Sequence, residues 1–163
     1  MQDEKTVNRE AWKVNYVTLL EEVKDFAGEE PWYVAAFANI SALLYEELPD
    51  LNWAGFYIVR GEELILGPFQ GKTACIRIAK GKGVCGTAWE QERIQRVPDV
   101  HLFPGHIACD SASNSEIVLP VRQDGQVVAV LDIDSPVFDR FSAEDERGLA
   151  AIADALSDLC TGF

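Results

Sequence analysis

The sequence predicts a single α+β domain with a mostly antiparallel sheet of about six strands, covered by helices from both ends of the chain. Three observations predict it. The length of 163 residues suits one hydrophobic core. Apolar residues recur at helical spacing near both ends, and short apolar runs between them are separated by tight turns. Hairpin-linked strands form antiparallel sheets, on which helices with one apolar face must pack.

Helical patterns occur in four segments, expected at about 8–28, 31–47 and 85–92 and from Ser142 to near the chain end. Asn8 can cap the first helix. Pro31 suits the first turn of the second helix, and Pro49 stops it. Ser142 begins the last helix as its cap. Residues 1–7 are expected to form a flexible tail, and the whole chain, 1–163, to form one domain.

Strand patterns occupy 53–59, 63–69, 74–79, 93–97, 116–122 and 127–133. The tight "RGEE" joins the first two strands and "QDGQ" joins the last two, so both pairs are expected to be hairpins. A long loop is expected between His101 and Ser115. No internal repeat or low-complexity linker indicates a second unit.

Composition excludes several classes of partner. The net charge of −13 would repel a phosphate backbone, so nucleic acid is not expected as a partner. No apolar run is long enough to span a bilayer, and the N-terminal residues lack the apolar core of a signal peptide. These features predict a cytoplasmic protein. In a reducing compartment its four cysteines are free, metal-bound or catalytic rather than structural cross-links.

The cysteines lie in different surroundings. Cys109 stands in the polar passage "FPGHIACDSASNSEIVLP", where a packing role suits a thiol least. For Cys75 and Cys85, packing and chemistry are both open, because free cysteine is often buried. Cys160, near the end of the last helix, is interpreted as packing. No pair has the C-x2-C spacing of structural zinc, so a metal site is not expected.

Three acids complete the candidate site. Glu116 starts one strand, whereas Asp132 and Asp134 end another, where a period of two places both aspartates on one face. Carboxylates gathered near an apolar sheet are unfavourable unless they bind a cation or share a proton. The alternative, a strand end facing water, remains open at this point.

The segment "GKTACIRIAKGKGVCGTAWEQERIQRVPDVHLFPGHIACDSASNSEIVLPV", with "NWAGFY" before it and "LDIDS" after it, resembles the free methionine-(R)-sulfoxide reductases, a family built on a GAF domain. The similarity runs from about Asn52 to the final helix. The cysteine motif "FPGHIACDSASNSEIV" matches without a break. Before "RVPDV" the family usually has a polar Gln-Thr-Gln stretch, whereas this chain has "ERIQ".

The resemblance implies an oxidoreductase that reduces free methionine (R)-sulfoxide to methionine. Cys109 would attack the sulfoxide sulfur and become a sulfenic acid, and Cys85 or Cys75 would resolve it as a disulfide. Thioredoxin would reduce that disulfide, so no bound cofactor is implied. The substrate-binding residues implied are Glu116, Asp132, Asp134, Trp53 and Tyr57, the two aromatic residues enclosing the methyl-sulfur end.

Elementary chemistry agrees with these roles. A carboxyl whose pKa is raised in a dry acidic pocket can protonate the sulfoxide oxygen near neutral pH, and other carboxylates can pair with the α-ammonium of a free amino acid. Two other functions remain open: a GAF module that senses a ligand or redox state, and a thiol-based metal store. The sequence also leaves a homodimer open.

Overall fold

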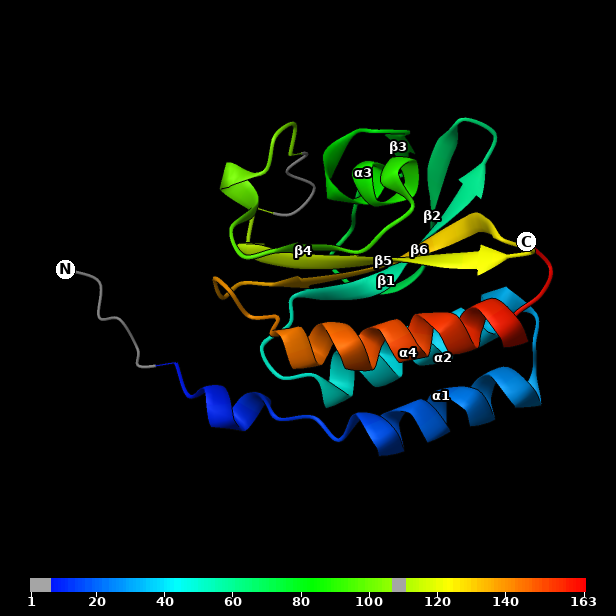
Figure 1. Cartoon of the computed structure of the whole chain (residues 1–163), viewed down its shortest axis with the longest axis horizontal. Helices are drawn as coiled ribbons and strands as arrows, with labels where there is room; N and C mark the ends of the chain where they lie inside the picture. Colours follow the sequence, from blue (N-terminus) through cyan, green and yellow to red (C-terminus); the bar gives the residue numbers. More distant parts are fainter. Residues whose placement is uncertain (1–6, 107–110) are drawn as a thin grey trace.

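A six-stranded antiparallel sheet in the order β3-β2-β1-β6-β5-β4 forms the centre of the computed structural model, which describes residues 7–106 and 111–163 (Figure 1). The strands are β1 (Trp53–Arg60), β2 (Glu63–Gly71), β3 (Arg77–Ala79), β4 (Gln95–Val97), β5 (Ser115–Gln123) and β6 (Gln126–Ser135). The long strands β5 and β6, which follow each other in the sequence, lie inside the sheet, and the short strands β3 and β4 form its edges. The predicted fold class is confirmed.

Both predicted hairpins form. Strands β1 and β2 pair antiparallel, as do β5 and β6. The turn between β5 and β6 contains Asp124 and Gly125, with φ of 52° and 78°. Two consecutive positive φ angles are typical of the type I′ turn that Asp-Gly favours, and its twist matches that of the flanking strands.

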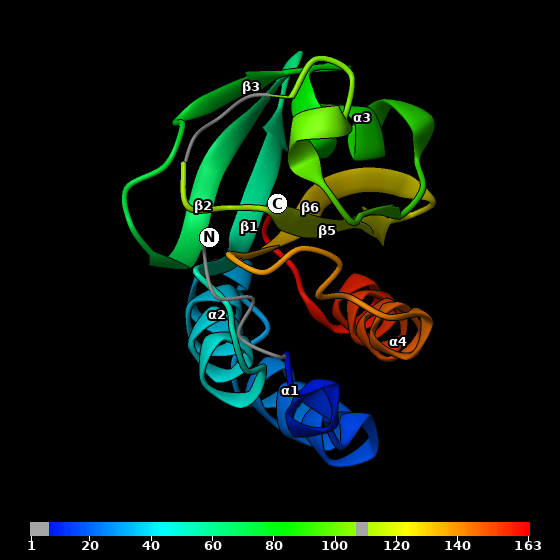
Figure 2. The same cartoon turned by 90° about the vertical axis from the view of Figure 1, so that its left-hand side faces the viewer.

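Helices cover the two faces of the sheet unequally (Figure 2). They are η1 (Arg9–Trp12), α1 (Tyr16–Glu29), α2 (Tyr33–Glu47), α3 (Gly83–Gln91), η2 (Val100–Leu102) and α4 (Ala143–Leu159). Helices α1, α2 and α4 lie on one side, whereas α3 lies on the other. In the described part of the chain, no helix is both long enough and apolar enough to cross a membrane.

The single first helix predicted from Asn8 is wrong, because the segment forms two helices. Helix η1 ends at Trp12, and α1 begins at Tyr16 after a new cap, Asn15, whose side chain accepts a hydrogen bond from the Thr18 amide. Asn8 makes no side-chain capping bond. The flexible tail predicted for 1–7 lies, except for residue 7, outside the described residues.

Other boundaries also differ from the prediction. Helix α2 begins at Tyr33 rather than near Pro31, because Pro31 and Tyr33 exchange backbone hydrogen bonds with Thr161 at the other end of the chain. The third strand begins at Arg77 rather than at residue 74. By contrast, Ser142 caps α4 through a complete capping box, as predicted.

The sheet separates two apolar clusters, and alternation along each strand divides its residues between them. In β1, Phe56 packs toward α1, α2 and α4, whereas Trp53 and Tyr57 face α3. In β5, Ile117 belongs to the larger cluster and Val118 to the α3 side. The large cluster stabilises the fold, and the smaller one surrounds the polar residues described next.

Candidate functional site

The register of the three central strands brings the predicted acids together. Asp134 in β6 lies opposite Trp53 in β1 on one side and Glu116 in β5 on the other. One step of two residues along β6, Asp132 lies opposite Gly55 and Val118. Asp132 and Asp134 therefore lie on one face of the sheet, as predicted, and the register places Glu116 on the same face.

These residues line a cavity of about 50 Å³ between α3 and the sheet. Its lining consists of Trp53, Tyr57, Ala74, Ile78, Lys82, Gly83, Val84, Cys85, His106, Ser113, Glu116, Asp132 and Asp134. The three acids are at most 9% exposed, so the alternative of a strand end facing water is wrong.

Burial perturbs the carboxyl groups strongly. It raises the pKa of Glu116 well above its ordinary value, and the neighbouring charges of Asp132 and Asp134 raise it further. Burial also raises the pKa of Asp132. Like charges this close resist being ionised together, and the side-chain interaction with Asp132 raises the pKa of Glu116 further, so the pair favours keeping one proton.

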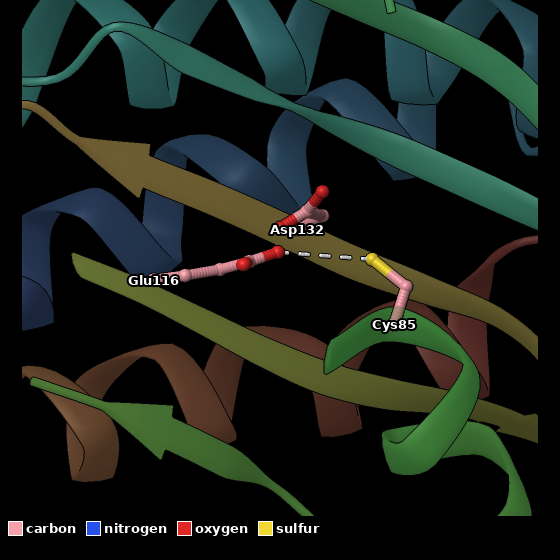
Figure 3. Close-up of side chains that lie close together, drawn as sticks. All are labelled: Cys85, Glu116 and Asp132. Atoms are coloured by element: carbon pink, nitrogen blue, oxygen red, sulfur yellow. Dashed lines mark hydrogen bonds between the residues drawn. The ribbon is translucent and has the colours of Figure 1, made fainter. Parts of the chain in front are cut away.

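Cys85 joins the two acids from the opposite side of the cavity (Figure 3). It lies in the first turn of α3, and its Sγ donates a hydrogen bond to Glu116 Oε1 at 3.9 Å. Burial raises the pKa of the Cys85 thiol well above its ordinary value, and the charge of Asp132 adds to this effect. Cys85 is therefore a neutral thiol that is only 4% exposed, and a weak nucleophile in this state.

One polar atom in the cavity lacks a partner. Asp132 is 6% exposed, and its Oδ1 is buried without a hydrogen bond among the described residues. A buried carboxylate oxygen in this condition is unfavourable by about 1–3 kcal/mol or more. Since no Lys or Arg forms an ion pair with Glu116 or Asp132 among the described residues, the site has capacity for an incoming cation.

Aromatic rings form the other wall. Trp53 and Tyr57 have ring centroids 5.9 Å apart and an interplanar angle of 23°, and Trp53 also stacks on Phe69 at 5.1 Å. Their polar atoms are held by the backbone: Trp53 Nε1 donates to the Lys72 carbonyl and Tyr57 Oη donates to the Cys75 carbonyl. The rings are thus fixed and present apolar surface to the cavity.

The remaining cysteines differ in state. Cys75 is disulfide-bonded, whereas Cys85 and Cys160 carry free thiols. Cys160 is 1% exposed within the large apolar cluster, so the packing interpretation is confirmed. Cys109 belongs to residues 107–110, which lie outside the described residues.

The structure adds pocket residues that the sequence analysis did not single out. The N-terminal residues of α3, Gly83 and Val84, line the cavity together with Lys82 and Ser113. Asn52 donates from Nδ2 to Ser113 Oγ at 2.9 Å, which joins the start of β1 to the loop before β5. The only sequence signal for these residues was Gly83 in "KGKG". A glycine at the start of a helix lets a ligand approach the free backbone amides there.

Comparison with known proteins agrees with this arrangement. Residues 35–159 match the family model described as GAF domain. The chain is 57% identical over 134 residues to the free methionine-R-sulfoxide reductase of Escherichia coli, covering 82% of this chain and 81% of that protein. The reduced form of fRMsr of Staphylococcus aureus superposes with a TM-score of 0.88 at 46% identity, covering 91% of this chain and 97% of that one. Free methionine-R-sulfoxide reductase from Neisseria meningitidis, in complex with its substrate, has a TM-score of 0.84 at 41% identity, covering 88% and 86%.

Proposed function

The chain belongs to the free methionine-R-sulfoxide reductase family, whose members carry a GAF domain, and we propose that it reduces free L-methionine (R)-S-oxide to L-methionine. The observation that carries this proposal is the buried Glu116–Asp132 pair beside an aromatic wall, in which the pKa of Glu116 is raised and Asp132 Oδ1 has no hydrogen-bond partner among the described residues. Sulfoxide reduction requires a proton donor for oxygen, and a free amino acid carries a cation that such a pocket would bind.

Binding follows from charge. The α-ammonium of the substrate would supply the donor that Asp132 Oδ1 lacks, and Asp134 lines the same cavity. Trp53 and Tyr57 would enclose the methyl-sulfur end, since a thioether packs favourably on aromatic rings. A methionine sulfoxide inside a protein has no α-ammonium, and its flanking peptides do not fit an enclosed cavity. The pocket therefore selects the free amino acid.

Glu116 would act as the proton donor. Its raised pKa favours the protonated carboxyl, which is the state needed to protonate the sulfoxide oxygen as the S–O bond breaks. Asp132 accepts the hydrogen bond of this carboxyl and so orients it. The two acids thus divide the work between binding the cation and delivering the proton.

The redox step moves the oxygen to a cysteine. The thiol sulfur of Cys109 would attack the substrate sulfur and form an S–S bond while Glu116 protonates the oxygen and the S–O bond breaks. The oxygen would then pass as hydroxide to the Cys109 sulfur, which breaks the S–S bond, releases methionine and leaves Cys109 as a sulfenic acid, and the thiol proton of Cys109 would return to Glu116. A second thiol then displaces water to form a disulfide. We assign this role to Cys75, because Cys75 is the residue found in a disulfide while Cys85 is a buried neutral thiol. Cys85 would act later or only in disulfide exchange.

We propose that thioredoxin reduces this disulfide. We also propose that the protein acts in the cytoplasm and needs no bound cofactor. The proposal is tested with racemic free methionine sulfoxide and thioredoxin, followed by chiral analysis of the remaining substrate. We expect the (R)-sulfoxide to be consumed and the (S)-sulfoxide to remain. N-acetylmethionine sulfoxide, which lacks the cation, should be reduced at least about tenfold less efficiently. Equal consumption of both epimers, or efficient reduction of the acetylated compound, would contradict the proposal.

A further inference from the structure

Three atoms that bind metals meet inside the cavity. Cys85 Sγ, a carboxylate oxygen of Glu116 and one of Asp132 all lie within 4.8 Å of one another, and all three residues are buried (Figure 3). They come from α3, β5 and β6, so the group is created by the docking of α3 on the sheet rather than by a local motif. Within the described part of the chain, none of the three side chains forms an ion pair with a cationic side chain.

The distance between the Cys85 and Glu116 ligand atoms is close to that of tetrahedral coordination. With Zn–S of about 2.3 Å and Zn–O of about 2.1 Å, two ligands of a tetrahedral zinc ion lie about 3.6 Å apart. Cys85 Sγ and Glu116 Oε1 lie 3.9 Å apart. Movement of a few tenths of an ångström, within the reach of one glutamate rotation, would close this difference.

A second observation points to a cation at the same place. Asp132 Oδ1 is buried and has no hydrogen-bond partner in the described ranges 7–106 and 111–163, and it belongs to a residue that lines the cavity. The cavity of about 50 Å³ has room for an ion and a water, since a water needs about 10–15 Å³ on this measure. Three protein ligands and one water make up the open type of zinc coordination.

We propose that Cys85, Glu116 and Asp132 form a binding site for a borderline-soft divalent cation, with Zn²⁺ as the fitting ion, and that the ion reversibly occludes the pocket. Coordination forms one metal–sulfur and two metal–oxygen bonds and releases the Cys85 thiol proton and the proton held by the acid pair. No electron is transferred. The occlusion rests on the proposed function, because it assumes that the substrate enters this cavity, whereas the ion site itself does not.

The donor set decides which ion fits. Mg²⁺ and Ca²⁺ require six or more oxygen ligands, whereas this site offers two carboxylates and one thiolate. Thiolate selects Zn²⁺ and its heavier analogue Cd²⁺ over those hard cations. An ion bound here would cover Asp132 Oδ1, the atom to which we assign the substrate ammonium, so ion and substrate would exclude each other.

The test uses Cd²⁺ on protein whose disulfide is intact, because Cys75 is then unable to act as a thiolate ligand. Without added thiol, the free thiols of the described chain are Cys85 and Cys160. We expect one equivalent of Cd²⁺ to bind with a cadmium–thiolate charge-transfer band. Cys85→Ser should remove the band and lower the affinity at least about 100-fold, while the matched control Cys160→Ser retains both.

A further variant keeps the test decisive if Cys85→Ser does not fold. Asp132→Asn retains the thiolate, so the band should persist while the affinity falls at least about tenfold. The ion site would be overturned by the absence of a band in the wild type, by a band that survives Cys85→Ser, or by one that disappears in Cys160→Ser.

Turnover then tests occlusion separately. With thioredoxin as reductant, Zn²⁺ should raise the KM for methionine sulfoxide without lowering kcat, and a chelator should reverse the effect. If Cd²⁺ binds at Cys85 but does not compete with the substrate, the proposed ion site stands and the proposed occlusion of the pocket is overturned. Complete absence of sulfoxide reduction in metal-free protein would instead overturn the proposed function and leave the Cd²⁺ result unaffected.

Discussion

Replacement of Glu116 by glutamine tests the division of roles between the two acids. Glu116→Gln removes the acidic proton but keeps the size and an N–H donor toward Asp132, so the pocket shape should survive. General acid catalysis typically contributes about 10²–10⁴-fold to a rate, which corresponds to about 2.7–5.5 kcal/mol of the activation barrier. We therefore expect kcat to fall by at least about 100-fold while KM changes by less than about threefold.

The pH dependence supplies an independent readout. The pKa of Glu116 is raised, so the wild-type enzyme keeps this proton to a higher pH than an ordinary glutamate would and loses it as pH rises further, and kcat should decline on the alkaline side. This alkaline limb should be absent in Glu116→Gln. The stability of the fold should also depend on pH, because ionising a buried acid is unfavourable. The Tm of Glu116→Gln should exceed that of the wild type by an amount that grows as pH rises above the ordinary pKa of a glutamate.

The assay is steady-state reduction with thioredoxin across a pH series, with thermal unfolding measured in the same buffers. Asp132→Asn is the matched variant, since it should mainly raise KM through loss of ammonium binding. A Glu116→Gln enzyme with wild-type kcat, or one that raises KM alone, would refute its role as proton donor. The role of Glu116 as proton donor would also be refuted if both variants kept the pH profile of the wild-type kcat.

Four further substitutions address the thiols and the scaffold. Cys109→Ser should abolish reduction, whereas Cys75→Ser should retain the first turnover and slow thioredoxin-dependent cycling, which a single-turnover assay separates from steady state; wild-type cycling in Cys75→Ser would contradict its assignment. Gly55→Ala should destabilise the fold by about 1–3 kcal/mol, because the new Cβ would lie 2.3 Å from Phe69 Cβ; an unchanged denaturation midpoint would contradict this. Arg140→Met should lower the free energy of unfolding by about 3–5 kcal/mol, because it removes the cation that pairs with buried Asp145. A decrease of less than about 1 kcal/mol would contradict a stabilising role for this ion pair.

Alternation made the acids of the site predictable. Asp132 and Asp134 are two residues apart in a strand, and that spacing alone places them on one face. Glu116 joined them because β5 and β6 form a hairpin around Asp124-Gly125, whose turn chemistry fixes the register. Local sequence therefore carried most of the information about the carboxylates.

The position of the thiols was not predictable in the same way. Cys85 is 31 residues from Glu116 in sequence, and the two meet because α3 packs across the sheet. The residue pattern of α3 does not predict where the helix packs on the sheet. A packing role and a chemical role therefore remained equally open for Cys85 and Cys75. Long-range packing distinguishes them: one thiol is buried and free, and the other is disulfide-bonded.

The error at the N-terminus has a similar origin. Asn8 and Asn15 are both good cap residues, and Trp12 and Tyr16 keep helical spacing across the break between them. Contacts from distant segments decide the outcome: Trp12 Nε1 donates to Asp50 and Tyr16 Oη donates to Asp145. A chain that must place both aromatic residues against separate partners ends one helix and begins another.

Two buried aspartates show how the fold treats structural and functional charge differently. Asp145 is 5% exposed and Asp132 is 6% exposed. Asp145 accepts hydrogen bonds from Tyr16 Oη at 2.6 Å, from Ser142 N at 2.8 Å and Oγ at 3.1 Å, and from Arg140 Nη1 at 3.1 Å.

Asp132, equally removed from water, has a second acid and a thiol beside it and one oxygen without a partner. Burial of this kind is unfavourable wherever it occurs, so a carboxylate that the protein satisfies itself stabilises the fold, whereas one left unsatisfied stabilises whatever cation enters. On that argument the Asp145 cluster is scaffold, and the cavity around Asp132 is where ligand binding supplies the missing free energy.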